Sequence, residues 1–256
     1  MNFLLAVWTL WRREIVRFLR QRNRIAGALG TPLVFWLIIG SGVGSSFKAP
    51  EALGGEGYLE YSFPGTLALI LLFTSIFSTI SIIEDRQAGF LQSALVAPVP
   101  RSAIILGKIL GGTSLAVLQA LIFVLLAPTV KISLSWEKFV AVAGVLALVA
   151  FALSALGFLI AWKMDSTQGF HAVMNLILMP MWLLSGSFFP ASGAPVWIRA
   201  IIYLNPLTYG VAAVRRVLYL NDAPSAIDLP SFAACLGVTV AFGLVAFAAT
   251  TWVASD

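Results

Sequence analysis

Residues 139–162 read FVAVAGVLALVAFALSALGFLIAW and contain no Asp, Glu, Lys or Arg. A helix of roughly 20 apolar residues is long enough to cross the hydrocarbon core of a bilayer. The whole chain of 256 residues is 60% hydrophobic and only 11% charged, whereas an ordinary soluble domain is about 25% charged. The composition therefore excludes a soluble domain and predicts a membrane protein.

Five further stretches of similar length are free of these four charged residue types, and each one predicts a membrane helix. We therefore predict an all-α membrane protein with six transmembrane helices. The predicted helices cover residues 27–47, 64–83, 109–130, 139–162, 170–189 and 231–253, within one transmembrane domain from 27 to 253 that follows an N-terminal segment of residues 1–26.

The distribution of Lys and Arg predicts which way the chain faces, because these residues are retained preferentially on the cytoplasmic side. With the N-terminus inside, ten lie in inner segments and six in outer segments. We therefore predict a multi-pass protein of the cytoplasmic (inner) membrane with both termini in the cytoplasm. The inner residues are Arg12, Arg13, Arg17, Arg20, Arg22, Arg24, Arg86, Arg101, Lys108 and Lys163, and the outer residues are Lys48, Lys131, Lys138, Arg199, Arg215 and Arg216.

The net charge of +5 comes mainly from an arginine cluster before the first span. On a helical wheel, residues 1–26 place Trp8 and Trp11 on an apolar face, and Arg12, Arg13 and Arg17 on the opposite face. Such a helix lies flat on the membrane, with its cations against anionic headgroups. We therefore expect membrane lipid, and no nucleic acid, as its partner. An anchor held by positive charge alone explains the arginines equally well.

The spans contain almost no group that could do chemistry. An intramembrane enzyme or a proton-coupled carrier needs ionisable side chains at bilayer depth. His171 and Cys235 are the only histidine and cysteine. Gly107-Lys108 lacks the first glycine and the following Ser or Thr of a phosphate-binding loop. We therefore predict no catalytic residue, no metal ligand and no cofactor on this chain, and an energy source outside it.

The predicted cytoplasmic loop 84–101 contains a short amphipathic helix. Phe90, Leu91 and Leu95 fall on one helical face, and Pro98 ends the helix. A helix of this kind, exposed on the cytoplasmic side, suits docking to a soluble partner. The alternative is a surface connector that rests on the headgroups.

Residues 187–221 are too rich in Gly and Pro to cross the membrane simply, yet too apolar for a free loop. We expect two short helices that dip into the outer leaflet and turn at Asn205-Pro206, since this arrangement satisfies the backbone. An interfacial aromatic loop is the alternative. Elsewhere, small residues permit close helix packing: Gly107 with Gly111, Gly40 with Gly42 and Gly44, and Ala150 with Ser154 and Gly157.

Four motifs in register carry a resemblance to a known family. They are Tyr61-x-Phe63-Pro64-Gly65, the run from Glu84 through Gly89 to Ala97-Pro98-Val99-Pro100, Ile105-Leu106-Gly107-Lys108, and Leu204-Asn205-Pro206-Leu207-Thr208-Tyr209. In this order they resemble the ABC-2 type family of ATP-binding-cassette transporter permeases, the membrane subunits of exporters for polysaccharides, lipo-oligosaccharides and drugs. The resemblance covers nearly the whole chain.

The resemblance implies a non-catalytic half-transporter that forms a homodimer, in which each copy docks one ABC ATPase subunit that binds ATP and Mg. Residues 1–26 then look like the family's interface helix. Residues 84–101 look like its coupling helix, with contacts from Glu84, Asp85, Arg86, Gly89, Phe90, Leu91, Leu95 and Pro98. Residues 187–221 look like re-entrant hairpins that gate the outer mouth through Phe188, Phe189, Pro190, Trp197, Asn205, Pro206 and Tyr209.

We expect spans one and five to part at the dimer interface and to pass an amphipathic substrate, such as a lipid-linked glycan, polysaccharide, lipid or drug, out of the cytoplasm. Phe35, Trp36 and Trp182 are candidate channel residues that suit either sugar stacking or a plain apolar wall. Two other functions stay open on the residues alone. One is a membrane assembly protein that carries nothing, and the other is an ion-coupled carrier, which the uncharged spans disfavour.

Overall fold

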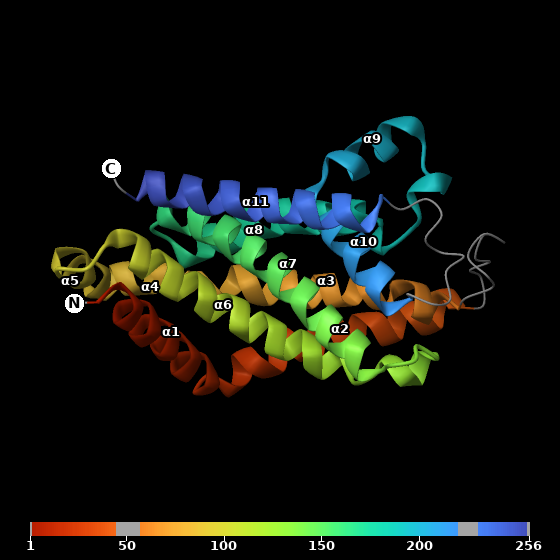
Figure 1. Ribbon diagram of the computed structural model, residues 1–256, viewed down its shortest axis with the longest axis horizontal. Coiled ribbons are helices and arrows are strands. Elements are labelled where there is room, and N and C mark those ends of the chain that lie inside the picture. The colour runs from red at the N-terminus through yellow and green to blue at the C-terminus, as the bar shows by residue number, and fades with distance from the viewer. Residues whose placement is uncertain (1, 45–56, 220–229, 255–256) are drawn as a thin grey trace.

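The computed structural model describes residues 2–44, 57–219 and 230–254, and in these ranges the chain forms helices and no strand. Most helices run along the long axis of the molecule (Figure 1). The start of α1 (Phe3–Leu19), the short helix α5 (Phe90–Val96) and the end of α11 (Phe232–Val253) lie together at one end, which we call the α5 end. The predicted all-helical fold is confirmed for the described residues.

Helix α3 (Tyr58–Ser78) forms the centre of the bundle. It packs against α2 (Arg22–Gly44), α6 (Arg101–Val124) and α7 (Trp136–Trp162). Residues 63–72 are all buried, because their sequence is apolar on every side of the helix and neighbours surround it. The core of the protein therefore follows α3.

Five helical segments in the described ranges are long and apolar enough to cross a membrane. The remaining predicted span is the first in the chain, residues 27–47. It corresponds to α2, whose apolar stretch is the shorter Gly30–Gly42. Positions 45–47 of that predicted span, and Lys48 after it, lie outside the described residues. The five segments are Tyr58–Gln87, which joins α3 to α4 (Ile80–Gln87), then α6, α7, Thr167–Ser187, which joins α8 (Thr167–Trp182) to the π-helical turn η3 (Leu183–Ser187), and α11.

The bounds of α6 differ from the prediction at both ends. The helix begins at Arg101 rather than at Ile109, because the buried charge of Lys108 is paired with carboxylates and does not end the apolar segment. It ends at Val124 instead of continuing to 130, where Pro128 lies in the 3-10 turn η2 (Ala127–Val130). Proline lacks the N–H that a continuing helix would need.

Small residues let helices approach closely at several predicted positions. A Cβ added to Gly107 would lie 2.9 Å from the Cβ of Leu10, and one added to Gly111 would lie 2.7 Å from the Cβ of Glu14. Both contacts join α6 to α1. Gly42 instead has open space beside it. The packing prediction is thus confirmed for Gly107 and Gly111, and wrong for Gly42 within this chain.

Two short helices follow α8 and the 3-10 turn η4 (Ala191–Gly193), and they lie at the end opposite α5, which we call the α9 end (Figure 1). They are α9 (Val196–Leu204) and α10 (Pro206–Leu218), and they meet at Asn205. The Asn205 side chain accepts a hydrogen bond from the Leu207 N–H at 3.0 Å and so caps α10. Positions 220–221 of the predicted hairpin lie outside the described residues.

Candidate functional site

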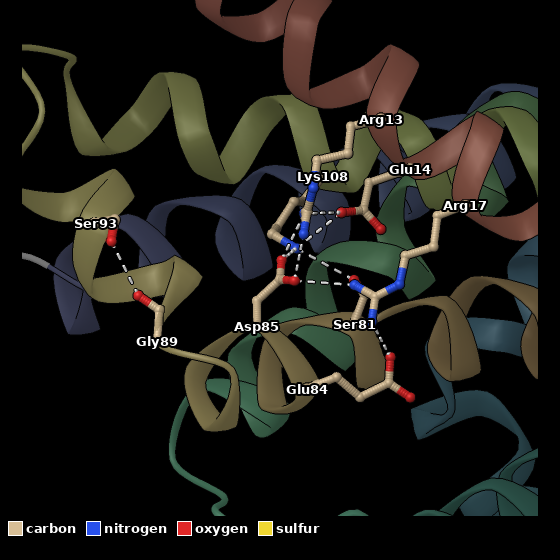
Figure 2. Close-up of polar contacts among 9 residues, drawn as sticks. All are labelled: Arg13, Glu14, Arg17, Ser81, Glu84, Asp85, Gly89, Ser93 and Lys108. Carbon is tan, nitrogen blue, oxygen red and sulfur yellow. Dashed lines mark hydrogen bonds and ion pairs between the residues drawn. The ribbon is translucent and has the colours of Figure 1, made fainter.

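Six charged side chains point toward one another near the α5 end, where α1, α4 and α6 meet (Figure 2). Three are basic and three are acidic, so their formal charges cancel. We call this group the charge cluster. Its members are Arg13, Glu14 and Arg17 of α1, Glu84 and Asp85 of α4, and Lys108 of α6.

Asp85 is the centre of the charge cluster and is only 2% exposed. Arg13 donates to both of its carboxylate oxygens, at 2.8 and 2.6 Å. Arg17 donates at 2.9 Å and the Lys108 ammonium at 2.6 Å. A buried carboxylate is tolerated when cations and hydrogen bonds satisfy its oxygens, and the bidentate guanidinium is the strongest arrangement of this kind.

Lys108 fills the space between α1 and α6 and is 5% exposed. Its ammonium donates to Glu14 at 2.9 Å, to Asp85 and, at 3.3 Å, to the Ser81 hydroxyl. Gly107 directly precedes Lys108, and Gly111 follows it by almost one helical turn. These two glycines let α1 approach closely enough for the Glu14 contact. The local sequence of α6 therefore builds this part of the cluster.

Arg17 and Glu84 form the more accessible edge of the charge cluster. The guanidinium donates to the Glu84 carboxylate at 2.5 Å, and both side chains are about one third exposed, at 28% and 31%. Solvent screens a pair in this position, so it contributes much less free energy than the Asp85 contacts.

Arg13 also connects α1 to α5. Its guanidinium carbon lies 3.8 Å from the centre of the Phe90 ring, which is a cation–π contact. The hydrogen bonds to Asp85 raise the pKa of Arg13 above its ordinary value, because the carboxylate stabilises the charged guanidinium. Arg13 therefore stays charged and touches both α4 and the first residue of α5.

The segment that follows the charge cluster, residues 87–100, contains no charged residue and is called the α5 knob. Gly89 joins α4 to α5 with a φ of +75°, which glycine adopts without strain. Leu91 is buried against the bundle, and Val96 is 85% exposed. The side chains on the outer surface of the knob are Gln87, Ala88, Gln92, Ser93, Val96 and Pro98.

The sequence placed Glu84, Asp85 and Arg86 among the contacts to a partner, and the structure directs these side chains into the chain itself. Arg86 donates to the backbone carbonyls of Trp162 and Met164, the latter at 2.9 Å, and forms an ion pair with Asp165 at 3.0 Å. Contact of these residues with a partner stays a prediction. Phe90, Leu95 and Pro98 lie on the knob as expected, the first two partly buried.

Some of the residues predicted for an interface helix point into the bundle, and the others lie on the surface. Arg13 and Arg17 point inward to Asp85, and the Trp11 indole N–H donates to the Ser114 hydroxyl at 3.0 Å. Trp8 and Arg12 are exposed. The helical wheel alone assigned all of the arginines to a headgroup-facing surface, because it could not show that α4 presents a buried carboxylate to α1.

The predicted gate residues lie at the α9 end. Asn205 donates to the carbonyls of Met181 and Leu184, at 2.6 and 3.0 Å, and thereby holds the helix junction against the end of α8. The Tyr209 hydroxyl donates to the Tyr203 carbonyl at 2.9 Å. Trp197 is exposed, Phe188, Phe189 and Pro190 are partly buried, and Pro206 is the first residue of α10. Their role as a gate stays a prediction.

Two of the three candidate channel residues are core residues within this chain. The Trp36 indole donates to the Leu59 carbonyl at 3.1 Å, and the Trp182 indole donates to the Gly65 carbonyl at 2.8 Å. Phe35 is exposed, with its ring centre 5.8 Å from that of Trp182. Phe35 is therefore the one of the three that is accessible, and the channel role stays a prediction for all of them.

The buried charged residues that sequence reasoning did not identify include Glu14, Lys108 and Arg215. Arg215 of α10 is 5% exposed, donates to the Tyr61 carbonyl at 3.1 Å and stacks 4.1 Å from the Tyr61 ring centre. A signal for Lys108 was present, because a lysine beside two closely packed glycines has little room to reach water. Nothing comparable marks Arg215 in the sequence.

Comparisons with known proteins place the chain in a family. A family model described as ABC-2 type transporter matches residues 5–219, and the chain belongs to this family. The chain is 25% identical over 254 residues to the inner membrane transport permease YadH of Escherichia coli, with 98% of this chain and 94% of YadH covered. It is 25% identical over 236 residues to nodulation protein J of Neorhizobium galegae, with 91% and 88% covered.

A further relative is named "Probable multidrug ABC transporter permease YbhR", from Escherichia coli. The two chains are 30% identical over 202 residues, which cover 74% of this chain and 52% of YbhR. Membership of the family makes the chain a multi-pass membrane permease subunit of an ABC transporter, a class of subunit that works with an ABC ATPase. The resemblance drawn from the four motifs is confirmed.

Proposed function

We propose that this chain is the permease of an ATP-driven exporter, in which the α5 knob docks on the ATPase and the charge cluster transmits its movement to α1 and α6. The observation that carries the proposal is the position of Asp85. It lies at the end of α4, just before the knob, and binds cations from two other helices. A displacement of the knob is thereby communicated to the rest of the bundle.

The strength of this connection follows from burial. Removing one partner of a buried ion pair costs about 3–5 kcal/mol, because the other charge is left uncompensated. When the partner supplies less free energy than is needed to separate these ion pairs, the pairs stay intact. A movement of the knob then carries α1, α4 and α6 with it. Leu91, buried beside α4, and Phe90, beneath the Arg13 guanidinium, fix the knob to the same group of helices.

The chemistry of the knob defines the surface that it fits. Its exposed residues are apolar, amide or hydroxyl side chains, and the charges of α4 are directed into the chain. The partner groove is therefore uncharged where it receives Val96, and shape complementarity and apolar burial supply the affinity. A charge placed on the knob would have no counterion and would pay the cost of desolvation.

The remaining parts of the proposal come from the family resemblance and the sequence. Two copies of the chain form a homodimer with two ATPases, which hold ATP and Mg, and both termini face the cytoplasm. An amphipathic substrate passes outward between spans one and five, and the α9–α10 hairpin gates the outer mouth. The arrangement of α1, α5 and the end of α11 at one end supports the common location of the termini.

The test uses two matched substitutions of exposed valines. Val96 of the knob is 85% exposed and Val196 of α9 is 81% exposed, so an Asp at either position displaces no packed side chain within the chain. We expect Val96→Asp to weaken ATPase binding by about tenfold or more, as a desolvated unpaired charge does. Val196→Asp should leave it unchanged.

The ATPase is first identified by its co-purification with the tagged permease, and its affinity is then measured by titration with the permease in nanodiscs. Equal affinity of the Val96→Asp variant and the unsubstituted protein would remove the knob from the docking surface. Loss of binding in the Val196→Asp variant as well would show a general folding defect and not a docking site.

A further inference from the structure

A cavity of about 360 Å³ lies between α1, α2, α3 and α8, next to the charge cluster. Its apolar wall comes from Phe18, Phe73, Phe77 and Ile80. Sites for small molecules usually measure about 300 to 1,000 Å³ and are mostly apolar with a few polar groups. This cavity is at the lower end of that range, which suits one compact molecule and not a sugar chain.

Two hydroxyl groups of the cavity wall, those of Thr74 and Ser78, can only accept a further hydrogen bond. The Thr74 hydroxyl donates its proton to the Gln119 side-chain oxygen at 2.8 Å, and the Ser78 hydroxyl donates to the Ser75 carbonyl at 2.6 Å. A hydroxyl has one proton and two lone pairs, so these two groups can only accept a further hydrogen bond. An occupant with a hydrogen-bond donor matches these two acceptors, whereas an anionic group placed against Thr74 and Ser78 would face their lone pairs.

The lining carries no fixed charge in the part of the chain that the structure describes. Among the described lining residues there is no carboxylate, ammonium or guanidinium group, and the other polar side chains among them are those of Thr31 and His171. The His171 ring centre lies 4.9 Å from that of Phe77. These two rings pack on each other, and together with Phe18 and Phe73 they give the cavity an aromatic wall that favours an aromatic occupant. An ion would lose its hydration there without compensation from the described residues.

We propose that this cavity binds an uncharged, aromatic amphipathic molecule that carries a hydrogen-bond donor, and that such molecules are the substrate class of the exporter. The second clause rests on the proposed function, whereas the binding itself does not. Phe18 directly follows Arg17 of the charge cluster, and Ile80 directly precedes Ser81, which hydrogen-bonds Lys108. An occupant therefore touches the same segments of α1 and α4 that hold the α5 knob.

Binding is tested with a pair of fluorescent probes that share one skeleton. N-phenyl-1-naphthylamine is uncharged and has one N–H donor, and 8-anilino-1-naphthalenesulfonate adds an anionic group. The full permease in nanodiscs, without ATPase or nucleotide, is titrated with each probe against empty nanodiscs. We expect saturable binding of the uncharged probe and at least tenfold weaker binding of the sulfonate.

Two substitutions locate the binding site. A Cβ on Gly27 meets no atom within 4 Å, so Gly27→Leu fills the cavity without a backbone clash, and Gly144→Leu on α7 is the matched control with the same open space. Gly27→Leu should weaken binding of the uncharged probe about tenfold or more, as overfilling a packed site does. Ser78→Ala should weaken it about fivefold, the effect of one lost hydrogen bond.

Several results would overturn the proposal. They are unchanged affinity in the Gly27→Leu variant, an equal loss in the Gly144→Leu control, or equally tight binding of the sulfonate. A phospholipid that co-purifies in stoichiometric amount and is lost in the Gly27→Leu variant would also overturn it, since the cavity would then be a lipid site. All of these measurements omit the ATPase, so they stay separate from a failure of the knob to dock.

Discussion

The two ends of the molecule solve one problem, the attachment of short helices to a membrane bundle, in different ways. At the α5 end, α4 is held by ion pairs between side chains, centred on Asp85. At the α9 end, Arg215 and Asn205 donate to backbone carbonyls of Tyr61, Met181 and Leu184. The α5 end has a network of buried ion pairs besides the backbone hydrogen bonds of Arg86, whereas Arg215 and Asn205 at the α9 end donate to the backbone.

The difference has a physical consequence for movement. At the Asn205 junction both the amide and the carbonyls are neutral, so a lost hydrogen bond there is exchanged for one to water at modest cost. A buried ion pair that separates leaves charge behind in a site of low polarity, at a higher cost. This difference supports the proposal that the α5 end moves as a unit and that the α9 end opens.

The largest expected effect is at the centre of the charge cluster. Asp85→Asn removes the countercharge of Lys108 and Arg13 and should lower the free energy of unfolding by about 3–5 kcal/mol. The measurement is an SDS unfolding titration of the purified permease. Asp165→Asn is the control, since Asp165 is 88% exposed and its ion pair with Arg86 is screened by solvent. Equal stability of the two variants would contradict the account of the cluster.

A smaller loss is expected at the α9 end. Arg215→Met removes a hydrogen bond to the Tyr61 carbonyl and a cation–π contact with the Tyr61 ring, together worth about 2–3 kcal/mol. Arg199→Met, in which an exposed arginine loses its bonds to loop carbonyls, should cost less than about 1 kcal/mol. The same titration measures both. A loss at Arg215 as large as that at Asp85 would remove the contrast between the two ends.

The helix junction provides the next test. Asn205→Ala removes the cap of α10 and two hydrogen bonds to the end of α8, and should cost about 1–2 kcal/mol. Ser135→Ala removes only the cap of α7 and should cost about 1 kcal/mol or less. If the two variants lost equal stability, the bonds from Asn205 to α8 would contribute nothing.

The smallest effect belongs to the accessible edge of the charge cluster. A double-mutant cycle of Arg17→Gln and Glu84→Gln should give a coupling free energy below about 1 kcal/mol, because solvent screens the pair. The coupling should fall further when the salt concentration rises toward 1 M, where the Debye length is about 3 Å. A coupling that is large and independent of salt would place this pair with the buried part of the cluster.

Much of the fold was predictable from local sequence. Uncharged stretches identify the long helices, and Asn205-Pro206 marks the junction of α9 and α10, because both signals act over a few residues. The start of α6 at Arg101 differs from the start of the predicted span because it depends on whether Lys108 is paired. That pairing joins Lys108 to Glu14 and Asp85, which are distant in the chain, and no local pattern contains it.

The candidate site was predicted only in outline. The position and amphipathic character of the segment around Phe90 follow from the spacing of its apolar residues, whereas the inward direction of Asp85 and Arg86 does not. A charged residue at the end of a span looks the same in sequence whether it faces solvent or a neighbouring helix. The exposed face of the knob, residues 87–100, is neutral, and contact of Glu84, Asp85 and Arg86 with a partner stays a prediction.

The central claim is that α1, α4 with the α5 knob, and α6 move as one unit. The test places spin labels at Thr9→Cys on α1 and at Ser93→Cys on the knob, in a Cys235→Ala background. Pulsed electron paramagnetic resonance then measures the distance between the two labels in the complex with the ATPase. We predict that the distance between the labels changes by less than about 2 Å between the nucleotide-free and ATP-bound states, and that the distribution broadens in the Asp85→Asn variant. A clear nucleotide-dependent shift between these labels in the protein with an intact Asp85 would contradict the claim.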